Sequence, residues 1–210
     1  MNTLSVFHLK HTIFAFFVLV TIASCVKPEA AKVQLEGKTM GTTYHVTYIE
    51  QPGMADQQQV QAQIDQVLKE VNQVASTYIN DSELSLFNHS HSTEPREASQ
   101  MLRLLFGEGS RLAQMTDGYL DITVGPLVNL WGFGPTHRPE KVPDDVAIAL
   151  ARTQTGVQYL QLEGSTVRKT KPELYVDLST IAKGYGVDVV AVVLEQQGIN
   201  NFVAEIGGEV

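Results

Sequence analysis

Asp177-Leu-Ser-Thr-Ile-Ala-Lys-Gly-Tyr-Gly186 divides the best-organised third of the chain, because here the apolar pattern changes from that of strands to that of a helix. Short apolar runs separated by turn residues lead up to it, which is typical of neighbouring strands. We expect these strands at residues 157–162, 166–169 and 174–178, with turns at Gly164 and Pro172. A further apolar strand is expected to begin within residues 201–210.

The second half of this segment predicts a long helix. Ser179 or Thr180 can cap its N-terminus. The helix should run to about Gln197, where Gly198 fits a C-terminal end. Val and Ala occupy most of its sides, so we expect it to be buried.

The chain before this region predicts a hairpin followed by helices. Residues 33–50 alternate in the manner of two strands. Apolar residues then recur at helical spacing from Val60 to Val74, and this helix should stop near Ser76. Further helices are expected at Ala98–Met115, with a bend at Gly107 or Gly109, at Pro143–Arg152, and in a short form after a cap at Asp81 or Ser82.

The first residues read as an export signal. Lys10 and His11 precede an apolar run from Thr12 to Ala23, and Cys25 follows after one more small residue. The run is shorter than the roughly 20 residues that a spanning helix needs, whereas a signal peptide needs only a basic start, a short core and small residues at the cut. The pattern resembles the bacterial lipobox, so residues 1–24 should be removed. An ordinary signal followed by an unrelated cysteine is the alternative.

Cys25 is the only cysteine, so no disulfide can form within the chain. Pairing with another chain is possible, but the position directly after the small residues favours acylation. A lipid such as palmitate at Cys25 would then anchor the protein to a membrane. Residues 25–32 read as a tether and residues 33–210 as the folded domain.

The charge balance is acidic. The chain has 15 Lys and Arg against 23 Asp and Glu, a formal net charge of −8 at pH 7. With no long basic cluster, this argues against nucleic acid as a partner and against a polybasic membrane patch. A nucleotide bound in a local pocket remains compatible with it.

The strand-to-helix junction is the strongest candidate for a site. A helix N-terminus offers unpaired N–H groups, and Lys183 adds a positive charge, so together they suit a phosphate. Asp177 or Thr180 can supply oxygen to a cation such as Mg²⁺. The alternative is that Asp177 and Thr180 are ordinary caps and Lys183 is solvated.

Two other stretches are candidates. Residues 116–134 are rich in glycine and hold two acids and the only Trp, so the backbone there can approach a ligand closely. Gly132-Phe-Gly134 lacks the third glycine of a dinucleotide fingerprint. In residues 76–88, Tyr78 can stack on a planar ring, although a core or surface tyrosine is the alternative.

Taken in order, five segments resemble blocks of the ApbE family, the FAD:protein FMN transferases. The segments are Met40-Gly-Thr-Thr-Tyr44, Ser82-Glu-Leu-Ser85 with Phe87-Asn88, Asp121 to Gly134, Asp177 to Tyr185, and Glu205-Ile-Gly-Gly208. The resemblance implies an α+β fold of mixed or antiparallel sheets packed with helices, lacking its C-terminal part. It also implies an enzyme that binds FAD with Mg²⁺, attaches FMN to a threonine or serine of a target protein, and releases AMP.

The resemblance further implies roles for individual residues. Flavin-nucleotide contacts are expected from Met40, Tyr78, Tyr119, Leu120, Asp121, Asp177 and Lys183, and Thr180 is expected to be a metal ligand. The target would be an exported flavoprotein subunit of a membrane redox pump. The protein would lie on the periplasmic side, and such a target favours the inner membrane.

The family's domain continues beyond the Gly-Gly block, where its remaining metal ligands lie, and the sequence predicts that the 210 residues alone transfer FMN inefficiently. Two other classes stay open. One is a flavin-binding lipoprotein, a carrier or scavenger, without transferase activity, and the other is a purely structural lipoprotein.

Overall fold

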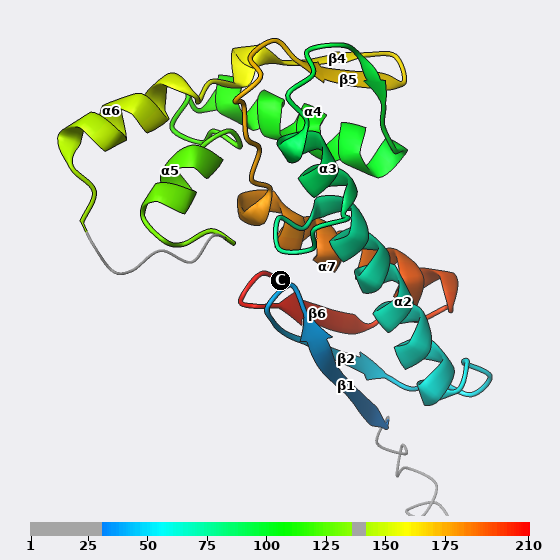
Figure 1. Cartoon of the computed structure of the whole chain (residues 1–210). Helices are drawn as coiled ribbons and strands as arrows, with labels where there is room; N and C mark the ends of the chain where they lie inside the picture. The colour runs from blue at the N-terminus through cyan, green and yellow to red at the C-terminus, as the bar shows by residue number, and fades with distance from the viewer. Residues whose placement is uncertain (1–30, 136–141) are drawn as a thin grey trace, which may run out of the picture.

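The computed structural model describes residues 31–135 and 142–210, which form two small antiparallel sheets and the helices around them (Figure 1). In chain order the elements are β1 (Lys32–Thr39), β2 (Thr42–Ile49), α2 (Gln57–Ala75), α3 (Glu83–His89), β3 (Arg96–Glu97), α4 (Gln100–Met115), α5 (Gly125–Leu130), α6 (Asp145–Thr153), a 3₁₀ turn η1 (Val157–Tyr159), β4 (Leu160–Glu163), β5 (Thr166–Lys169), α7 (Ser179–Gln196) and β6 (Phe202–Ile206). The expected α+β class is confirmed. The signal peptide and Cys25 lie outside the described residues. Within these ranges no helix has the length and apolar character needed to cross a bilayer.

The first sheet has the strand order β1-β2-β6, with both pairs antiparallel. The predicted hairpin is confirmed, and its turn is made by Met40 and Gly41, which have φ values of 50° and 73°. One face of the sheet is apolar and lies against α2 and α7 (Figure 1). The core formed there includes Leu35, Tyr44, Val46, Val60, Ile64, Leu68, Val190, Leu194, Ala204 and Ile206.

Tyr44 shows how closely this core is filled. Its side chain is fully buried, and its hydroxyl donates to Asp65 Oδ1 at 2.6 Å and accepts from Gln61 Nε2 at 2.6 Å. A Cβ at Gly37, the residue opposite on β1, would overlap the ring. Burial raises the pKa of the Tyr44 hydroxyl, and the hydrogen bond to the Asp65 carboxylate raises it further.

The second sheet has the strand order β3-β5-β4 and packs with α3 and α4. Phe87 of α3 and Phe106 of α4 meet edge to face, with ring centroids 5.1 Å apart. The expected helix at Ala98–Met115 is confirmed as α4, but it runs without a break through Gly107 and Gly109. Gly109 instead makes room for a neighbour, because a Cβ there would lie 2.6 Å from Cδ1 of the buried Ile122.

Most other predicted elements are also confirmed. The helix at Val60–Val74 is α2, and the one at Pro143–Arg152 is α6, which Asp144 caps through a 2.8 Å bond from Ala147 N. Ser82 caps α3, accepting from Ser85 N at 3.0 Å. The apolar end of the chain forms β6.

Four predictions about the last third were wrong. Residues 157–159 form the 3₁₀ turn rather than a strand, and residues 174–178 pair with no strand. The long helix α7 has no capping side chain at its N-cap, Leu178. Neither Ser179 nor Thr180 caps it, because Asp177 takes that role by accepting from Ser179 N at 2.8 Å. Finally, α7 is buried along one side only, at Ala182, Gly186, Val190 and Leu194.

Candidate functional site

A groove of about 1020 Å³ opens between the β1–β2 turn, one side of α2 and the N-terminus of α7. Its size is at the upper end of the roughly 300–1,000 Å³ that small-molecule sites occupy. Met40, Tyr78 and Lys183, three of the residues singled out in the sequence, lie together in its wall. Lys38 and Lys69 add two more positive charges to the wall, and Asp65 adds a negative one.

Met40 reaches the groove because two glycines shape its surroundings. With φ near 50° it occupies the left-handed region at the hairpin turn, and Gly41 follows it there. Its side chain packs against both apolar cores. A Cβ at Gly186 would lie 2.9 Å from Met40 Cε and 3.0 Å from Ile206 Cδ1, so a glycine at 186 lets the methionine lie on α7.

Lys183 is held by the turn that follows β6. Its Nζ lies 3.0 and 2.9 Å from the two carboxylate oxygens of Glu209. Gly207 has φ 55°, and a Cβ there would lie 3.3 Å from Lys183 Cδ. The side chain of Lys183 is 32% exposed, so an anion in the groove would meet a cation that is accessible but already paired.

The same turn is tied to the open face of the first sheet. The carboxylate of Glu205 accepts from Gly208 N and, at 2.8 Å, pairs with His45 Nδ1. The hydrogen bond from His45, together with the one from Gly208 N, lowers the pKa of Glu205. A carboxylate therefore orders the Gly-Gly turn beside Lys183.

Asp177 is buried directly behind the groove. Its backbone N–H donates to Ile122 O at 2.7 Å, and its Oδ1 accepts from Ser179 N at 2.8 Å and from the Ser179 hydroxyl. Ser179 itself lines the groove. Asp177 thus fixes the first turn of α7, which is the positive end of the helix dipole and is suited to an anion.

The Tyr119-Leu120-Asp121 turn does not line this groove. Tyr119 is almost fully exposed, whereas Leu120 packs partly on the core below α4. Asp121 Oδ1 accepts from Thr123 N at 2.8 Å and from Thr123 Oγ1 at 2.7 Å, which closes a local turn. The turn is nevertheless joined to the site, because Ile122 O holds the Asp177 N–H.

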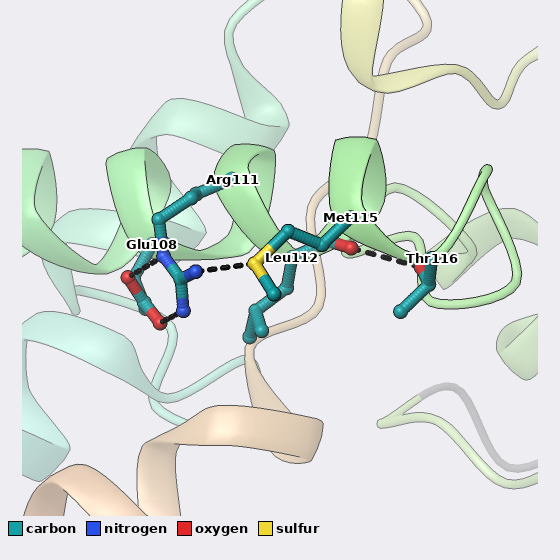
Figure 2. A network of polar contacts seen from close by, with 5 residues as sticks. All are labelled: Glu108, Arg111, Leu112, Met115 and Thr116. Carbon is teal, nitrogen blue, oxygen red and sulfur yellow. Dashed lines mark hydrogen bonds and ion pairs between the residues drawn. The ribbon is translucent and has the colours of Figure 1, made fainter.

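A polar network fixes the end of α4 just before this turn (Figure 2). Arg111 Nε donates to Glu108 Oε2 at 2.8 Å, and another guanidinium nitrogen contacts Met115 Sδ. The Thr116 hydroxyl donates to Leu112 O at 2.8 Å and accepts from Leu120 N at 3.0 Å. Thr116 is therefore the member of the network that connects α4 to the turn.

Tyr78 links the groove to the glycine-rich segment. Its hydroxyl donates to Phe133 O at 3.0 Å, and its side chain is 65% exposed. Phe133 and Trp131, the only tryptophan of the chain, are also exposed. The ring of Tyr78 is therefore available for stacking, as the sequence suggested, and its orientation is set by a backbone contact.

The expected metal ligand Thr180 lies exposed on the first turn of α7. Across residues 31–135 and 142–210, no three His, Cys, Asp or Glu side chains come together as metal ligands. The Thr180 hydroxyl and the Asp177 carboxylate, one oxygen of which already accepts from Ser179, do not make the octahedral oxygen site that Mg²⁺ takes. The described residues alone therefore do not fit a complete magnesium site.

Sequence reasoning missed several residues that shape the site. Glu209 and Lys69 stand in no recognised pattern, and nothing in the sequence places them at the groove. Asn88 lay inside a recognised block without a role, yet its side chain bonds twice to the backbone next to Asp177. In each case the role becomes visible only in three dimensions, because the contacts join residues far apart in the chain.

Comparison with known proteins agrees with this geometry. The ApbE family profile matches residues 40–210. The FAD:protein FMN transferase of Vibrio cholerae is 52% identical over 202 residues, covering 96% of this chain and 60% of that protein. The Haemophilus influenzae protein of the same name is 45% identical over 204 residues, covering 94% of this chain and 59% of that protein. The chain thus spans about 60% of the length of these curated relatives.

Solved structures agree as well. The flavin transferase ApbE of Vibrio cholerae superimposes with a TM-score of 0.84 at 55% identity, covering 86% of this chain and 58% of that one. The apo form of the Pseudomonas stutzeri flavinyl transferase ApbE gives a TM-score of 0.81 at 34% identity, covering 86% of this chain and 60% of that one. On sequence and structure together, the chain belongs to the ApbE family.

Proposed function

We propose that this chain is part of an FAD:protein FMN transferase and forms the face of the enzyme that holds the flavin nucleotide. The observation that carries the proposal is the convergence of Met40, Tyr78 and Lys183, from three distant parts of the sequence, on one groove. The names of the relatives from Vibrio cholerae and Haemophilus influenzae support the activity.

In this proposal the groove orients FAD by three kinds of contact. The exposed ring of Tyr78 stacks on a planar ring of the substrate, and Met40 supplies an apolar contact. Lys183 and the N-terminus of α7, which Asp177 fixes, neutralise the pyrophosphate. Tyr119, Leu120 and Asp121 would contact the nucleotide outside the groove, from the turn joined to Asp177.

The reaction would exchange the phosphoanhydride bond of FAD for a phosphoester bond to the target. A serine or threonine hydroxyl of the target loses its proton and bonds to the phosphorus nearer the flavin, while the bond from that phosphorus to the bridging oxygen breaks and AMP leaves. Such transfers depend mainly on positioning and charge neutralisation. Lys183 and the α7 N-terminus are suited to both tasks.

We include Mg²⁺ in the proposal, with Thr180 as one ligand. Because the described residues offer so few oxygens, the ion would be held mainly by phosphate oxygens and water, as Mg²⁺ commonly is. When bound, it would add to the charge neutralisation. Loss of FAD binding or cleavage on adding EDTA, restored by excess Mg²⁺, is the expected result.

The place of action is also proposed. Cys25 would carry the lipid that anchors the protein on the periplasmic side, with the inner membrane favoured, and the target would be an exported flavoprotein subunit of a membrane redox pump. Cys25→Ser should abolish incorporation of a labelled fatty acid. Equal labelling of the variant would remove the anchor from the proposal.

The central test is a titration of FAD, with Mg²⁺, into the wild-type protein and Lys183→Ala, followed by flavin fluorescence. We expect weaker binding by the variant, with a larger loss at low salt than at high salt, because the missing contribution is electrostatic. Lys32→Ala, on the far end of β1, is the matched control and should bind as the wild type does. Equal affinity of Lys183→Ala at low salt would contradict the proposed pyrophosphate contact.

Activity separates the remaining classes. AMP release and an FMN-modified target peptide in mass spectrometry would support the transferase. Flavin binding without either product would favour the alternative of a flavin-binding carrier, and no flavin binding at all would favour a structural lipoprotein. Repeating the assay with the chain extended to the length of its relatives should raise the yield of FMN peptide, since Thr180 would gain partners for the metal.

A further inference from the structure

We propose that Asn88 is a positioning residue for the site, holding Asp177 and the first turn of α7 in place against the groove. The relevance of Asn88 to FAD binding and transfer rests on the proposed function. The contacts that carry it are independent of that function.

Asn88 lies at the end of α3 and is only 7% exposed. Its Nδ2 donates to Val176 O at 2.8 Å, and its Oδ1 accepts from Val176 N at 2.8 Å. These two bonds reproduce what a neighbouring strand would offer to one residue of an antiparallel pair. A side chain 88 positions away thus replaces the strand partner that residues 174–178 lack.

A second side chain secures the same junction. Lys169 Nζ is buried and donates to Asn88 O at 3.0 Å and to Leu174 O at 3.1 Å. The end of α3 and the segment before α7 are therefore bound at two points two residues apart. Only one peptide then separates Val176 from Asp177, whose N–H is bonded in turn to Ile122 O.

A short series of contacts connects Val176 to the groove. Asp177 Oδ1 holds Ser179 N at 2.8 Å, and Ser179 lines the groove. Because α7 has no capping side chain at Leu178 itself, the direction of its first turn depends on Asp177. A displacement of Val176 would therefore shift the helix end that is suited to a phosphate.

The chemistry of the contact singles out asparagine. A planar amide has one donor group and one acceptor oxygen at the spacing that a peptide unit presents. A carboxylate has no donor for Val176 O, and an aliphatic side chain leaves both buried backbone groups without a partner. Glutamine has the right groups one methylene too far from the helix.

The test compares Asn88→Asp and Asn88→Leu with Leu84→Ala. Leu84 lies on the same helix, α3, and is fully buried, but its aliphatic side chain makes no hydrogen bond to Lys169 or to the segment before α7. The three variants should lower the midpoint of thermal unfolding. Only the two Asn88 variants should also weaken FAD binding, by about tenfold, the equivalent of one lost hydrogen bond.

Hydrogen exchange followed by mass spectrometry supplies a readout that needs no flavin. In the wild type, the Val176 N–H should exchange slowly although it belongs to no sheet. Both Asn88 variants should accelerate exchange across residues 175–180 and leave α2 unchanged, whereas Leu84→Ala should not affect residues 175–180 selectively.

Two results would overturn the positioning role. One is rapid exchange at Val176 in the wild type, a measurement that requires no variant to fold. The other is a loss of FAD affinity in Leu84→Ala as large as in the Asn88 variants. If the wild type binds no FAD, the proposed function fails, while the exchange data still decide whether Asn88 holds the segment.

Discussion

The two regions that meet at the N-terminus of α7 are built in different ways. On one side, β1, β2 and β6 pair through regular backbone ladders and rest on the apolar faces of α2 and α7. On the other side, the segments around Ile122 and Val176 carry no strand pairing and are held by side chains and single backbone hydrogen bonds. We call these two segments the irregular side. Periodic patterns encode the first side, and individual contacts between distant residues encode the second.

The irregular side nevertheless buries its apolar residues as completely as the sheet does. It has its own buried apolar core, which includes Ile122, Leu174, Val176 and Leu178, all fully buried. Regularity of the backbone and density of packing are thus separate properties. Substitutions at buried positions in both regions test whether the two are equally well packed.

The largest effect is expected from Ile122→Ala. Ile122 is fully buried against Gly109, and truncation of such a residue costs about 2–5 kcal/mol because it leaves a cavity. Val46→Ala, within the regular sheet, is the matched comparison and should cost a similar amount. Urea unfolding of both variants measures the two values, and a loss confined to Val46→Ala would mean that the irregular side is loosely packed.

A smaller effect is expected from the buried Lys169. Burial lowers its pKa from 10.5 to about 8, so between these values the unfolded chain binds more protons than the folded one. Stability contributed at this position should therefore rise with pH, by about 2 kcal/mol between pH 7 and 9.5. The check is the difference in unfolding free energy between wild type and Lys169→Met across that range.

Subtracting the unfolding free energy of Lys169→Met from that of the wild type removes the contribution of the buried tyrosines. Their raised pKa values make stability fall with pH at higher pH, the opposite of the Lys169 effect. A difference that stays flat from pH 7 to 9.5 would mean that the Lys169 ammonium is no harder to bury than an exposed one. Burial of the Lys169 ammonium would then cost no folding free energy.

The third effect concerns binding and has an unusual sign. Because Glu209 already pairs with Lys183, an anion must displace it, so Glu209→Gln should tighten the binding of FAD or pyrophosphate. We expect about a threefold gain, since an exposed ion pair contributes less than roughly 1 kcal/mol. Calorimetric titration measures it, with Glu195→Gln at the far end of α7 as the control. Weaker binding by Glu209→Gln would make Glu209 a direct contributor to the site.

The smallest effect is expected from the surface network of Figure 2. Glu108 and Arg111 form a pair on the open side of α4, and the hydrogen bond from Arg111 lowers the pKa of Glu108. Water and salt screen such a pair, so Glu108→Gln should leave the thermal midpoint unchanged. Thr116→Val should lower it, because Thr116 bonds to Leu120 N in the irregular side. Equal shifts for both variants would contradict this ranking.

The same contrast explains what could be predicted from the sequence. The hairpin, α2, α4, α6, and the Ser82 cap of α3 follow from periodicity and local capping, and all are present. The strand expected at residues 174–178 is absent because the backbone N–H and C=O of Val176 bond to the Asn88 amide instead of a neighbouring strand. No local rule reports a partner 88 residues away.

The candidate site was predictable in part for the same reason. The junction of Asp177, Thr180 and Lys183 is a local feature, so its position at a helix N-terminus could be anticipated, although the capping residue is Asp177. Met40 entered only through resemblance to a family, whereas Tyr78 was also a candidate for stacking on a planar ring, and the structure brings both to the groove. The pairing of Lys183 with Glu209 and the lack of a complete set of metal ligands in the described residues became visible only in three dimensions.

The position of Trp131 gives this protein an intrinsic optical probe. As the only tryptophan of the chain, it stands at the end of α5, two residues before the carbonyl that orients Tyr78. Indole emission overlaps the absorption band of oxidised flavin, so a flavin seated beside Tyr78 would quench Trp131 by energy transfer. The arrival and departure of the nucleotide can then be followed in real time by stopped-flow fluorescence, without any label.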